Sequence, residues 1–504
     1  MRSLHRSSAW LLALGSSVLA GTSLAAPPRG RPSAAESEVD DTSPAAPELV
    51  HLEAAGLTAE MVGKKAAATS YRAKASEAAV REAAARVDEA WVGFLPRLGA
   101  TARYTRLSVF TQGQLIDVPG FNPVFSSQKP YEEGKTPVPL DPNFAGVANG
   151  DAFRLPIIPN QYLLQFSVVV PISDMILRVT QTYAAASHAE DAARYDAVTA
   201  HAKAAAEGKV AYYTWLRAKG AQTVASLALR DQQNHLRDTK NLQSTGNSAR
   251  ADLLRAEGSV AAAELAVERA NDFASVTEKQ VRFAMHVGDD ERLVPAEGFE
   301  VHSPSLAPLE QVTREGFAAR LELKSLDASA KAMRAQGRAA RFAGLPQLGA
   351  FGDLVHANPN PRTVPQQERW LPTWAAGVQV TWSPNDALTG FAAGAGSSAR
   401  ADALDAERAA AREAIEIEIM QAYHEVRQST ALVESSRRHL VSAEETYRAA
   451  RQLFGTGRIP SSTLTDAETD LTRARLGALN AAVDARIARV RLEHALGQDL
   501  RGSR

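Results

Sequence analysis

A duplicated pattern of spacings constrains this 504-residue chain more than any other feature. The sequence LPRLGA at residues 95–100 returns as LPQLGA at residues 345–350, and each copy opens a strand-like stretch. A second strand-like stretch ends at Pro171 in the first copy and at Pro384 in the second. We therefore predict an internal duplication, in which the same series of helices and strands occurs twice.

Long helical tracts follow both prolines. An Ala-rich tract of 75 residues separates Pro171 from Gly246, and one of 73 residues separates Pro384 from Gly457. At 1.5 Å per residue each tract is about 110 Å long, far longer than a usual globular helix. Shorter helical patterns run from the first glycine to Met285, from Leu309 to Phe342, from Ile459 to Leu496, and from Leu52 to Val92. Two short helices laid end to end match one long helix. The sequence thus predicts a mainly α fold, a rod of antiparallel helices with four strands at one end.

Composition and charge exclude several classes of function. The 56 basic and 57 acidic residues give a net charge of −1, which argues against a nucleic-acid partner because phosphates require a basic surface. The absence of cysteine excludes disulfides, a cysteine-linked lipid anchor, zinc–thiolate sites and cysteine nucleophiles. The 11 histidines are scattered, and no His, Asp and Glu cluster has ligand spacing. We therefore predict no metal, no cofactor and no enzymatic activity.

The first residues have the pattern of a secretory signal. Basic residues precede the apolar run at residues 10–20, and a small-residue cleavage site follows it. This run is too short for a membrane-spanning helix, which needs about 20 residues. We predict a signal peptide at residues 1–26 and a disordered leader, rich in Pro, Ser and acidic residues, at 27–50. The two structural repeats then occupy residues 51–300 and 301–504.

The strands carry the pattern of a membrane barrel. Past the signal no apolar run is long enough for a spanning helix, so a crossing of the membrane would require a closed β-barrel. Within residues 162–170, apolar side chains alternate with Gln165 and Ser167, and residues 373–383 alternate in the same way. Such alternation gives an apolar outer face and a polar inner face. Four strands are fewer than the roughly eight of a small closed barrel, so several chains must contribute. The alternative is a sheet packed in a soluble sandwich.

Several local patterns give narrower expectations. The alternation of the first strand changes between Tyr104 and Leu107, which indicates a β-bulge. The residue pairs 173–174 and 385–386 follow the junction prolines and are expected to act as helix N-caps. The glycines at positions 390, 394 and 396 indicate either close packing or a local break in the second long helix. Residues 111–160, dense in Pro and Gly, predict an irregular connection between two strands.

Both long tracts end in similar turns. Gly246 and Gly457 are expected to adopt the left-handed conformation that ends a helix, and polar residues then start the next helix. The sequence DLLRAE at residues 252–257 corresponds to TLTDAE at residues 463–468. An ordinary helical hairpin explains these turns structurally. Their position at the end of the rod opposite the strands also makes them the place where an assembly can narrow.

The duplicated strand start, the junctions at Pro171 and Pro384, and the paired turns resemble those of the outer-membrane efflux protein family, the TolC-like channel-tunnels of Gram-negative envelopes. The resemblance covers about residues 52–496. It implies a homotrimer in outer-membrane lipid, in which four strands per subunit complete a shared transmembrane β-barrel. Long antiparallel coiled-coil helices then form a tunnel in the periplasm. It also implies a periplasmic adaptor and an inner-membrane transporter as partners.

The resemblance further implies that the helical turns form a gate. The candidate gate residues are Gly246, Asp252, Gly457, Arg458, Thr463 and Asp466. The family's basic gate position falls on Ile459, next to Arg458, so this chain departs from the usual Arg–Asp latch. The residues after the junction prolines also depart, since the family's Asp-Gly-Gly is replaced by DMI at 174–176 and DAL at 386–388.

These expectations combine into one functional hypothesis. The chain is expected to be a passive outer-membrane exit channel for substrates of a tripartite efflux or type I secretion system, gated at the tips of its helical hairpins. Its cargo is open among drugs, metals, small molecules and proteins. The alternative is a soluble periplasmic or surface coiled-coil protein with a structural or adhesive role and no channel activity. That alternative leaves the four alternating strands unexplained.

Overall fold

The structure, a computed structural model, describes residues 56–108, 158–246, 248–300, 306–363 and 366–498. The predicted signal peptide, the predicted leader and most of the segment 111–160 lie outside the described residues. Residues 49–504 belong to one structural unit.

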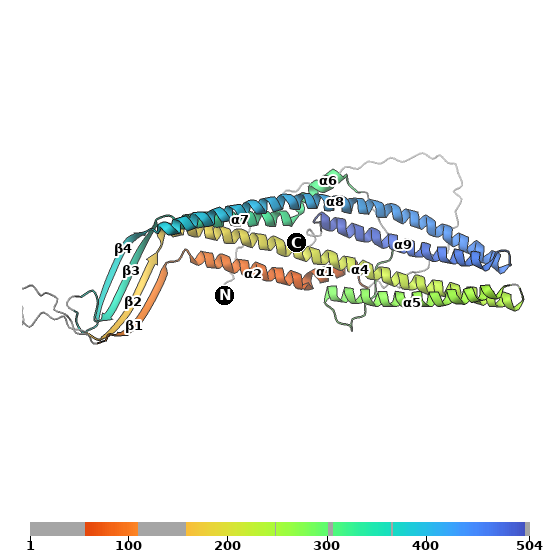
Figure 1. The fold of residues 1–504 in the computed structure, drawn as a ribbon, viewed down its shortest axis with the longest axis horizontal. Helices are drawn as coiled ribbons and strands as arrows, with labels where there is room; N and C mark the ends of the chain where they lie inside the picture. Colours follow the sequence, from red (N-terminus) through yellow and green to blue (C-terminus); the bar gives the residue numbers. More distant parts are fainter. Residues whose placement is uncertain (1–55, 109–157, 247, 301–305, 364–365, 499–504) are drawn as a thin grey trace, which may run out of the picture. The chain divides into compact units, whose positions relative to one another are not determined.

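Helices and strands occur in the same order twice (Figure 1). The first series comprises α1 (Ala59–Thr69), α2 (Tyr71–Val92), β1 (Arg97–Arg106), β2 (Asn160–Val170), α4 (Thr180–Ser244) and α5 (Arg250–Met285). The second comprises α6 (Leu309–Ala319), α7 (Leu321–Ala343), β3 (Gln347–Asn358), β4 (Leu371–Thr381), α8 (Pro384–Gly455) and α9 (Ser461–Ala495). Between β2 and α4 lie the short helix α3 (Ile172–Asp174) and a π-helical turn (Met175–Val179). This order fits the predicted duplication, whose boundaries stay a prediction.

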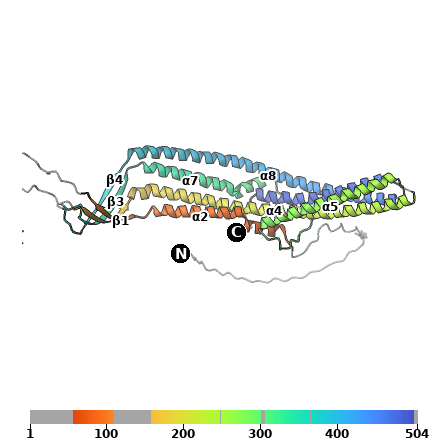
Figure 2. The same ribbon diagram turned by 60° about the horizontal axis from the view of Figure 1, so that its bottom comes forward.

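Each long helix is flanked by shorter ones along its length. α4 runs beside α2 and α1 and then beside α5, whereas α8 runs beside α7 and then beside α9 (Figures 1 and 2). This is the predicted arrangement, in which two short helices match one long one. The two series meet where α4 contacts α7 and α9.

Two of the predicted helices are interrupted. Residues 52–92 and 309–342 were each expected to form one helix, but the first breaks at Ser70 and the second at Arg320. The backbone is extended at both residues, with ψ of 127° and 116°. The Ser70 hydroxyl accepts a bond from the Ala73 amide, while Arg320 pairs with Glu418 of α8. Because neither break contains Gly or Pro, the sequence carries no local signal for it.

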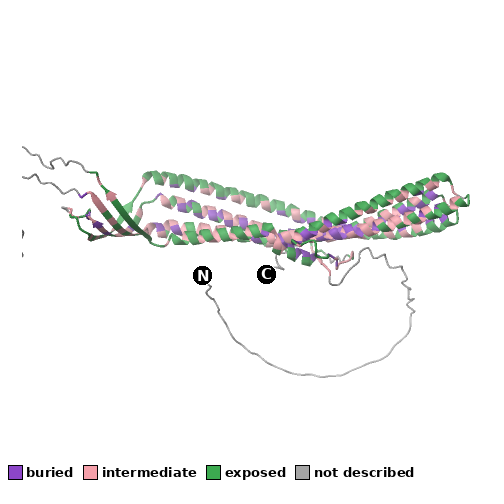
Figure 3. Ribbon diagram, turned by 90° about the horizontal axis from the view of Figure 1, so that it is seen from below, coloured by how far each residue is buried: buried purple, intermediate pink, exposed green. Residues whose placement is uncertain are grey.

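The core lies between the helices of each series. Tyr212, Trp215 and Leu216 of α4 are fully buried and contact Val62 of α1 and Val281 of α5. A second cluster packs α6, α8 and α9 together in the other series. Figure 3 shows buried positions along the helices, whereas the strands carry mostly exposed and intermediate positions. One face of the sheet therefore has no covering layer in a single chain.

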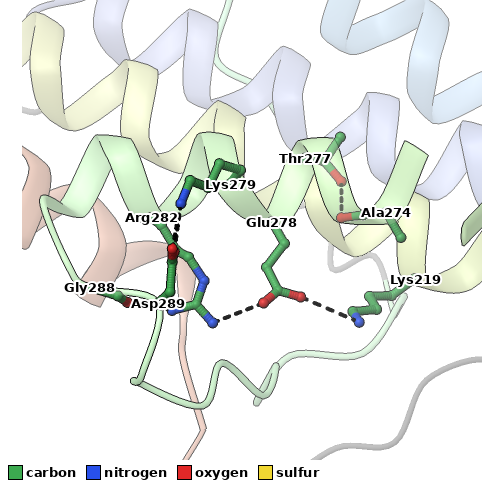
Figure 4. A network of polar contacts seen from close by, with 8 residues as sticks. All are labelled: Lys219, Ala274, Thr277, Glu278, Lys279, Arg282, Gly288 and Asp289. Atoms are coloured by element: carbon green, nitrogen blue, oxygen red, sulfur yellow. Dashed lines mark hydrogen bonds and ion pairs between the residues drawn. The ribbon is translucent and has the colours of Figure 1, made fainter. Parts of the chain in front are cut away.

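A polar network fixes the end of α5 (Figure 4). Arg282 donates to the Gly288 carbonyl at 2.7 Å and to Glu278 at 2.9 Å. Glu278 also lies 3.6 Å from the Lys219 ammonium of α4, and Lys279 pairs with Asp289 at 2.6 Å. The contacts of Arg282 and Lys279 hold the segment that follows α5 against α5 itself.

The four strands form one antiparallel sheet in the order β1-β2-β3-β4. Pairing between β1 and β2 runs without interruption from Arg97 opposite Val169 to Arg106 opposite Asn160. The predicted β-bulge is therefore wrong. Tyr104 and Leu107 are an odd number of residues apart, so a regular strand places them on opposite faces.

The predicted helix N-caps are also wrong. Neither long helical tract has a side-chain bond from its capping residue to the first turn. The Ser173 hydroxyl instead accepts a bond from the Leu348 amide of β3 at 2.8 Å. Asp174 accepts a bond from Arg178 of the next turn at 3.0 Å. These side chains fasten the first tract to the sheet and to itself, because partners nearer than the free amides are available.

Two glycines of α8 allow close contact with α7. A Cβ atom at Gly390 would lie 2.6 Å from the Ala340 carbonyl oxygen, and one at Gly394 would lie 2.6 Å from Cγ of Arg341. A Cβ atom at Gly396 would meet nothing within 4 Å. α8 continues through all three positions. Of the two interpretations, close packing is therefore correct at positions 390 and 394.

We predict opposite effects of alanine at two of these positions. Gly390→Ala should destabilise the subunit by about 1–3 kcal/mol, because the new methyl group overlaps a backbone carbonyl. Gly396→Ala should stabilise it by about 0.5–1 kcal/mol, because alanine favours the helix and the site is open. Denaturation midpoints in detergent would measure both. Equal midpoints for the two variants would contradict the packing at Gly390.

Candidate functional site

One face of the sheet is apolar across all four strands. The register places Leu98 beside Val168, Phe166 beside Leu354, and Leu354 beside Trp374. Further members of this face are Ala100, Ala102, Tyr104, Tyr162, Leu164, Leu348, Ala350, Ala376, Val378 and Val380. Trp374 is 77% exposed and Val378 is 73% exposed. Exposure of so large an apolar surface indicates contact with lipid or with another chain.

Aromatic side chains gather at one end of this face. The rings of Tyr104 and Tyr162 lie 5.1 Å apart, and that of Trp370 lies 5.9 Å from Tyr162. His356 stacks on Trp370 at 4.9 Å. Such rings are common where a membrane surface meets water.

The opposite face of the sheet is more polar. Gln165, Thr373 and Gln379 occupy it, in register with residues of the neighbouring strands. Asp353 of β3 lies on the same face and pairs with Arg362 at 2.6 Å. The sheet thus separates an apolar side from a side that can be wet.

The outer edges of the sheet lack strand partners among the described residues. β1 pairs with β2 alone, and β4 pairs with β3 alone. Backbone N–H and C=O groups at an open edge can pair with another strand. In an apolar environment they must do so, since each unpaired group costs several kcal/mol.

The first hairpin ends in a tight turn between α4 and α5. Gly246 has a φ of 80° and donates from its amide to the Gln243 carbonyl at 2.9 Å. This left-handed conformation is the one predicted. Asp252 lies in the first turn of α5, half-buried, and its carboxylate is 3.5 Å from Arg255. An acidic side chain at a helix N-terminus is favoured by the helix dipole.

The second hairpin ends in the same way between α8 and α9. Gly457 has a φ of 69° and donates to the Phe454 carbonyl at 2.9 Å. Arg458, Thr463 and Asp466 are exposed. Within the described residues, no hydrogen bond or ion pair joins the predicted gate residues of the two hairpins. Their role as a gate stays a prediction.

The two hairpins contact each other through α4 and α9. Near the tips this contact contains a buried polar cluster, with His235, Ser461 and Glu468 at most 8% exposed. His235 Nδ1 lies 2.9 Å from Glu468 Oε2, and its Nε2 lies 2.9 Å from Ser461 Oγ. Gln232 donates to the same Glu468 oxygen at 3.0 Å.

Sequence reasoning missed this cluster. It considered the histidines by their spacing along the chain, and His235 and Glu468 are 233 residues apart. The duplicated turn sequence gave no signal either, because Glu468 corresponds to Glu257, and only Glu468 is buried.

Two kinds of feature are absent from the described residues. None of the helices that the structure describes has the length and apolar character needed to cross a membrane. Within the same ranges, no three His, Cys, Asp or Glu side chains lie together in a way that would hold a metal ion.

A comparison with protein families gives one match. Residues 315–498 match the family described as outer membrane efflux protein. Over these residues, about a third of the chain, the sequence is similar to the outer membrane efflux protein family. The resemblance predicted from the sequence is therefore confirmed. The predicted outer-membrane location, with the helices in the periplasm, is confirmed by the same match. No curated protein matches the chain.

Solved structures agree with this outer membrane efflux family in fold. The CmeC outer membrane channel of Campylobacter jejuni is 14% identical, with a TM-score of 0.69 over 89% of this chain and 91% of CmeC. The outer membrane protein VceC of Vibrio cholerae is 13% identical, with a TM-score of 0.65 over 87% of this chain and 96% of VceC. The open-state MtrE channel of Neisseria gonorrhoeae is 16% identical, with a TM-score of 0.65 over 87% of this chain and 88% of MtrE. The predicted fold class is confirmed.

The two faces of β4 should respond differently to charge. Val378→Arg should cost about 2–4 kcal/mol of folding free energy in lipid, because it places a cation on the apolar face. Gln379→Arg, one residue away on the polar face, should change stability little. Urea titration of protein refolded in lipid vesicles would measure both. A similar loss for both variants would contradict the assignment of the two faces.

Proposed function

We propose that this outer-membrane efflux protein is the passive exit channel of a tripartite efflux or type I secretion system. Three copies each contribute four strands to one closed barrel in the outer membrane. Their helices together form a tunnel in the periplasm, and a periplasmic adaptor links it to an inner-membrane transporter. The transporter supplies the energy, and the channel supplies the route.

One observation carries this proposal, namely a sheet that is apolar on one face and open at both edges. In lipid, an open edge leaves backbone groups without partners, and closure of the sheet by further copies removes that cost. A soluble coiled-coil protein would expose this apolar face to water instead. The sheet therefore favours the channel over the alternative derived from the sequence.

We propose further that the two hairpin tips form the gate. Three subunits bring together three copies each of Asp252, Arg458, Thr463 and Asp466 around the end of the tunnel. Rings of carboxylates favour the passage of cations over anions. Gly246 and Gly457 shape the turns that carry these residues.

Conductance of the purified protein tests the gate. The mature chain, extracted from outer membranes in mild detergent, should have the mass of a trimer and a small single-channel conductance in planar bilayers. Asp252→Ala and Asp466→Ala should each raise the conductance, because polar links between neighbouring tips are lost, and should weaken the preference for cations.

Asp402→Ala serves as the control, since it removes an exposed carboxylate of α8 that lies away from both tips. This variant should conduct like the wild type. A water-soluble monomer without conductance would contradict the channel and leave the structural or adhesive alternative.

A further inference from the structure

The two hairpins of a subunit meet mainly through the helices α4 and α9. α4 packs on α5 within the first hairpin, and α8 packs on α9 within the second. Between the two hairpins, the most extensive contact is the one that α4 makes with α9. Any movement that separates the two tips of a subunit must therefore loosen the α4–α9 contact.

This contact changes in character along its length. Toward the middle of α4, Arg217 pairs with Asp484 and Gly220 lies against Leu479. Asp231 and Arg475 form the next pair, at 3.4 Å. The pairs farther from the tips are thus half-buried ion pairs or apolar contacts. Of these pairs, Arg217–Asp484 is the more exposed, with side chains 27% and 48% exposed, so water screens it more.

Closer to the tips, the contact is a closed polar cluster. A carboxylate only accepts hydrogen bonds, so His235 Nδ1 carries the hydrogen that points to Glu468. The other ring nitrogen bonds Ser461, the first residue of α9. His235 therefore links α4 to α9 at two points that are two helical turns apart.

Apolar side chains surround the cluster on the side of the tips. The His235 ring lies 5.2 Å from that of Phe454 on α8. Phe454, Leu464 and Ala467 are buried together, with Leu242 of α4 packed against them. On α8, burial raises the pKa of Tyr447 to about 12. His235, Ser461 and Glu468 are themselves at most 8% exposed, so each polar group depends on its partners in the cluster.

The predicted gate residues do not make such contacts within one subunit. Arg458 is exposed, and the family's basic position is occupied by Ile459, which packs at the edge of the apolar cluster. The strongest polar connection between the two hairpins of one subunit is thus the buried cluster in the α4–α9 contact.

We propose that His235, Glu468 and Ser461 form a buried clasp that holds the two hairpins together and sets how readily the channel opens. This inference rests on the proposed function, and it assigns regulation of the gate to buried residues that are not among the predicted gate residues. Separation of α4 from α9 exposes Glu468 to water and breaks both bonds of His235. Closure restores them, so the clasp favours the closed channel.

Thr239 provides an independent position at which to test the clasp. It lies one turn from His235 on the same face of α4, it is fully buried, and its hydroxyl has no hydrogen-bond partner. A buried hydroxyl without a partner opposes closure, because it finds water only when the interface opens. Its removal should have the opposite effect to removal of the clasp.

Single-channel recording of the full trimer in planar bilayers tests the clasp. His235→Ala should raise the open probability about tenfold, since a buried carboxylate loses its main donor. Ser461→Ala should raise it less. Thr239→Val, which keeps the shape but removes the hydroxyl, should lower it.

Arg217→Ala is the matched control, because it breaks an α4–α9 contact away from the tips and should leave the open probability unchanged. The double variant His235→Ala with Glu468→Gln should open less than the sum of its single effects, since the two residues act as a pair. If these residues had only a structural role, their variants would lower the denaturation midpoint without these opposite and non-additive changes in open probability.

The absence of cysteine from the chain permits a second readout. Leu464→Cys places a thiol at a position that is 2% exposed, within the apolar cluster next to the clasp. A thiol reagent should label this residue faster when His235→Ala is also present, and at an unchanged rate when Arg217→Ala is present. Equal rates in all three backgrounds would contradict the clasp.

The outcomes separate the two proposals. If wild type and Asp252→Ala conduct as expected but the clasp variants behave as wild type, the clasp is wrong and the channel stands. If no variant conducts under any condition, the proposed function itself fails.

Discussion

Backbone hydrogen bonding at the edges of the sheet is the constraint on which the rest of the structure depends. Four antiparallel strands satisfy one another internally, but β1 and β4 each keep one side open. In lipid, where the apolar face of the sheet would lie, neither water nor the lipid can hydrogen-bond the backbone groups at these edges. The proposed trimer would supply strand partners for both edges, and the long helices of its three copies would then lie around a shared axis.

Close packing of neighbouring helices is a second constraint on the structure. Gly390 lies against the Ala340 carbonyl, and Gly220 lies against Leu479, so backbones meet where a larger residue would separate them. Such contacts make the pairs α7–α8 and α4–α9 depend on shape, since small side chains leave little apolar area to bury. Where two helices bury little apolar area against each other, one well-placed polar cluster has a large influence on whether they stay together.

Charge is distributed accordingly along the hairpins. Exposed carboxylates such as Asp466 occur at the tips, where water screens them. Glu468, only two residues further along α9, is buried and fully dependent on His235 and Gln232. Two carboxylates that are two residues apart in the sequence therefore have different environments, because they lie on different faces of the helix.

The sequence by itself determined the element order, the matched helix lengths, the left-handed turns at Gly246 and Gly457, and the two-faced strands. These features depend on periodicity and on local backbone preference, which neighbouring residues express directly. Only the tertiary structure decided the breaks at Ser70 and Arg320, the bonds of Ser173, and the pairing of His235 with Glu468. Apart from the break at Ser70, where the cap bond is local, each of those involves a partner far away in the sequence. No local pattern records which side chain a long helix will meet across an interface.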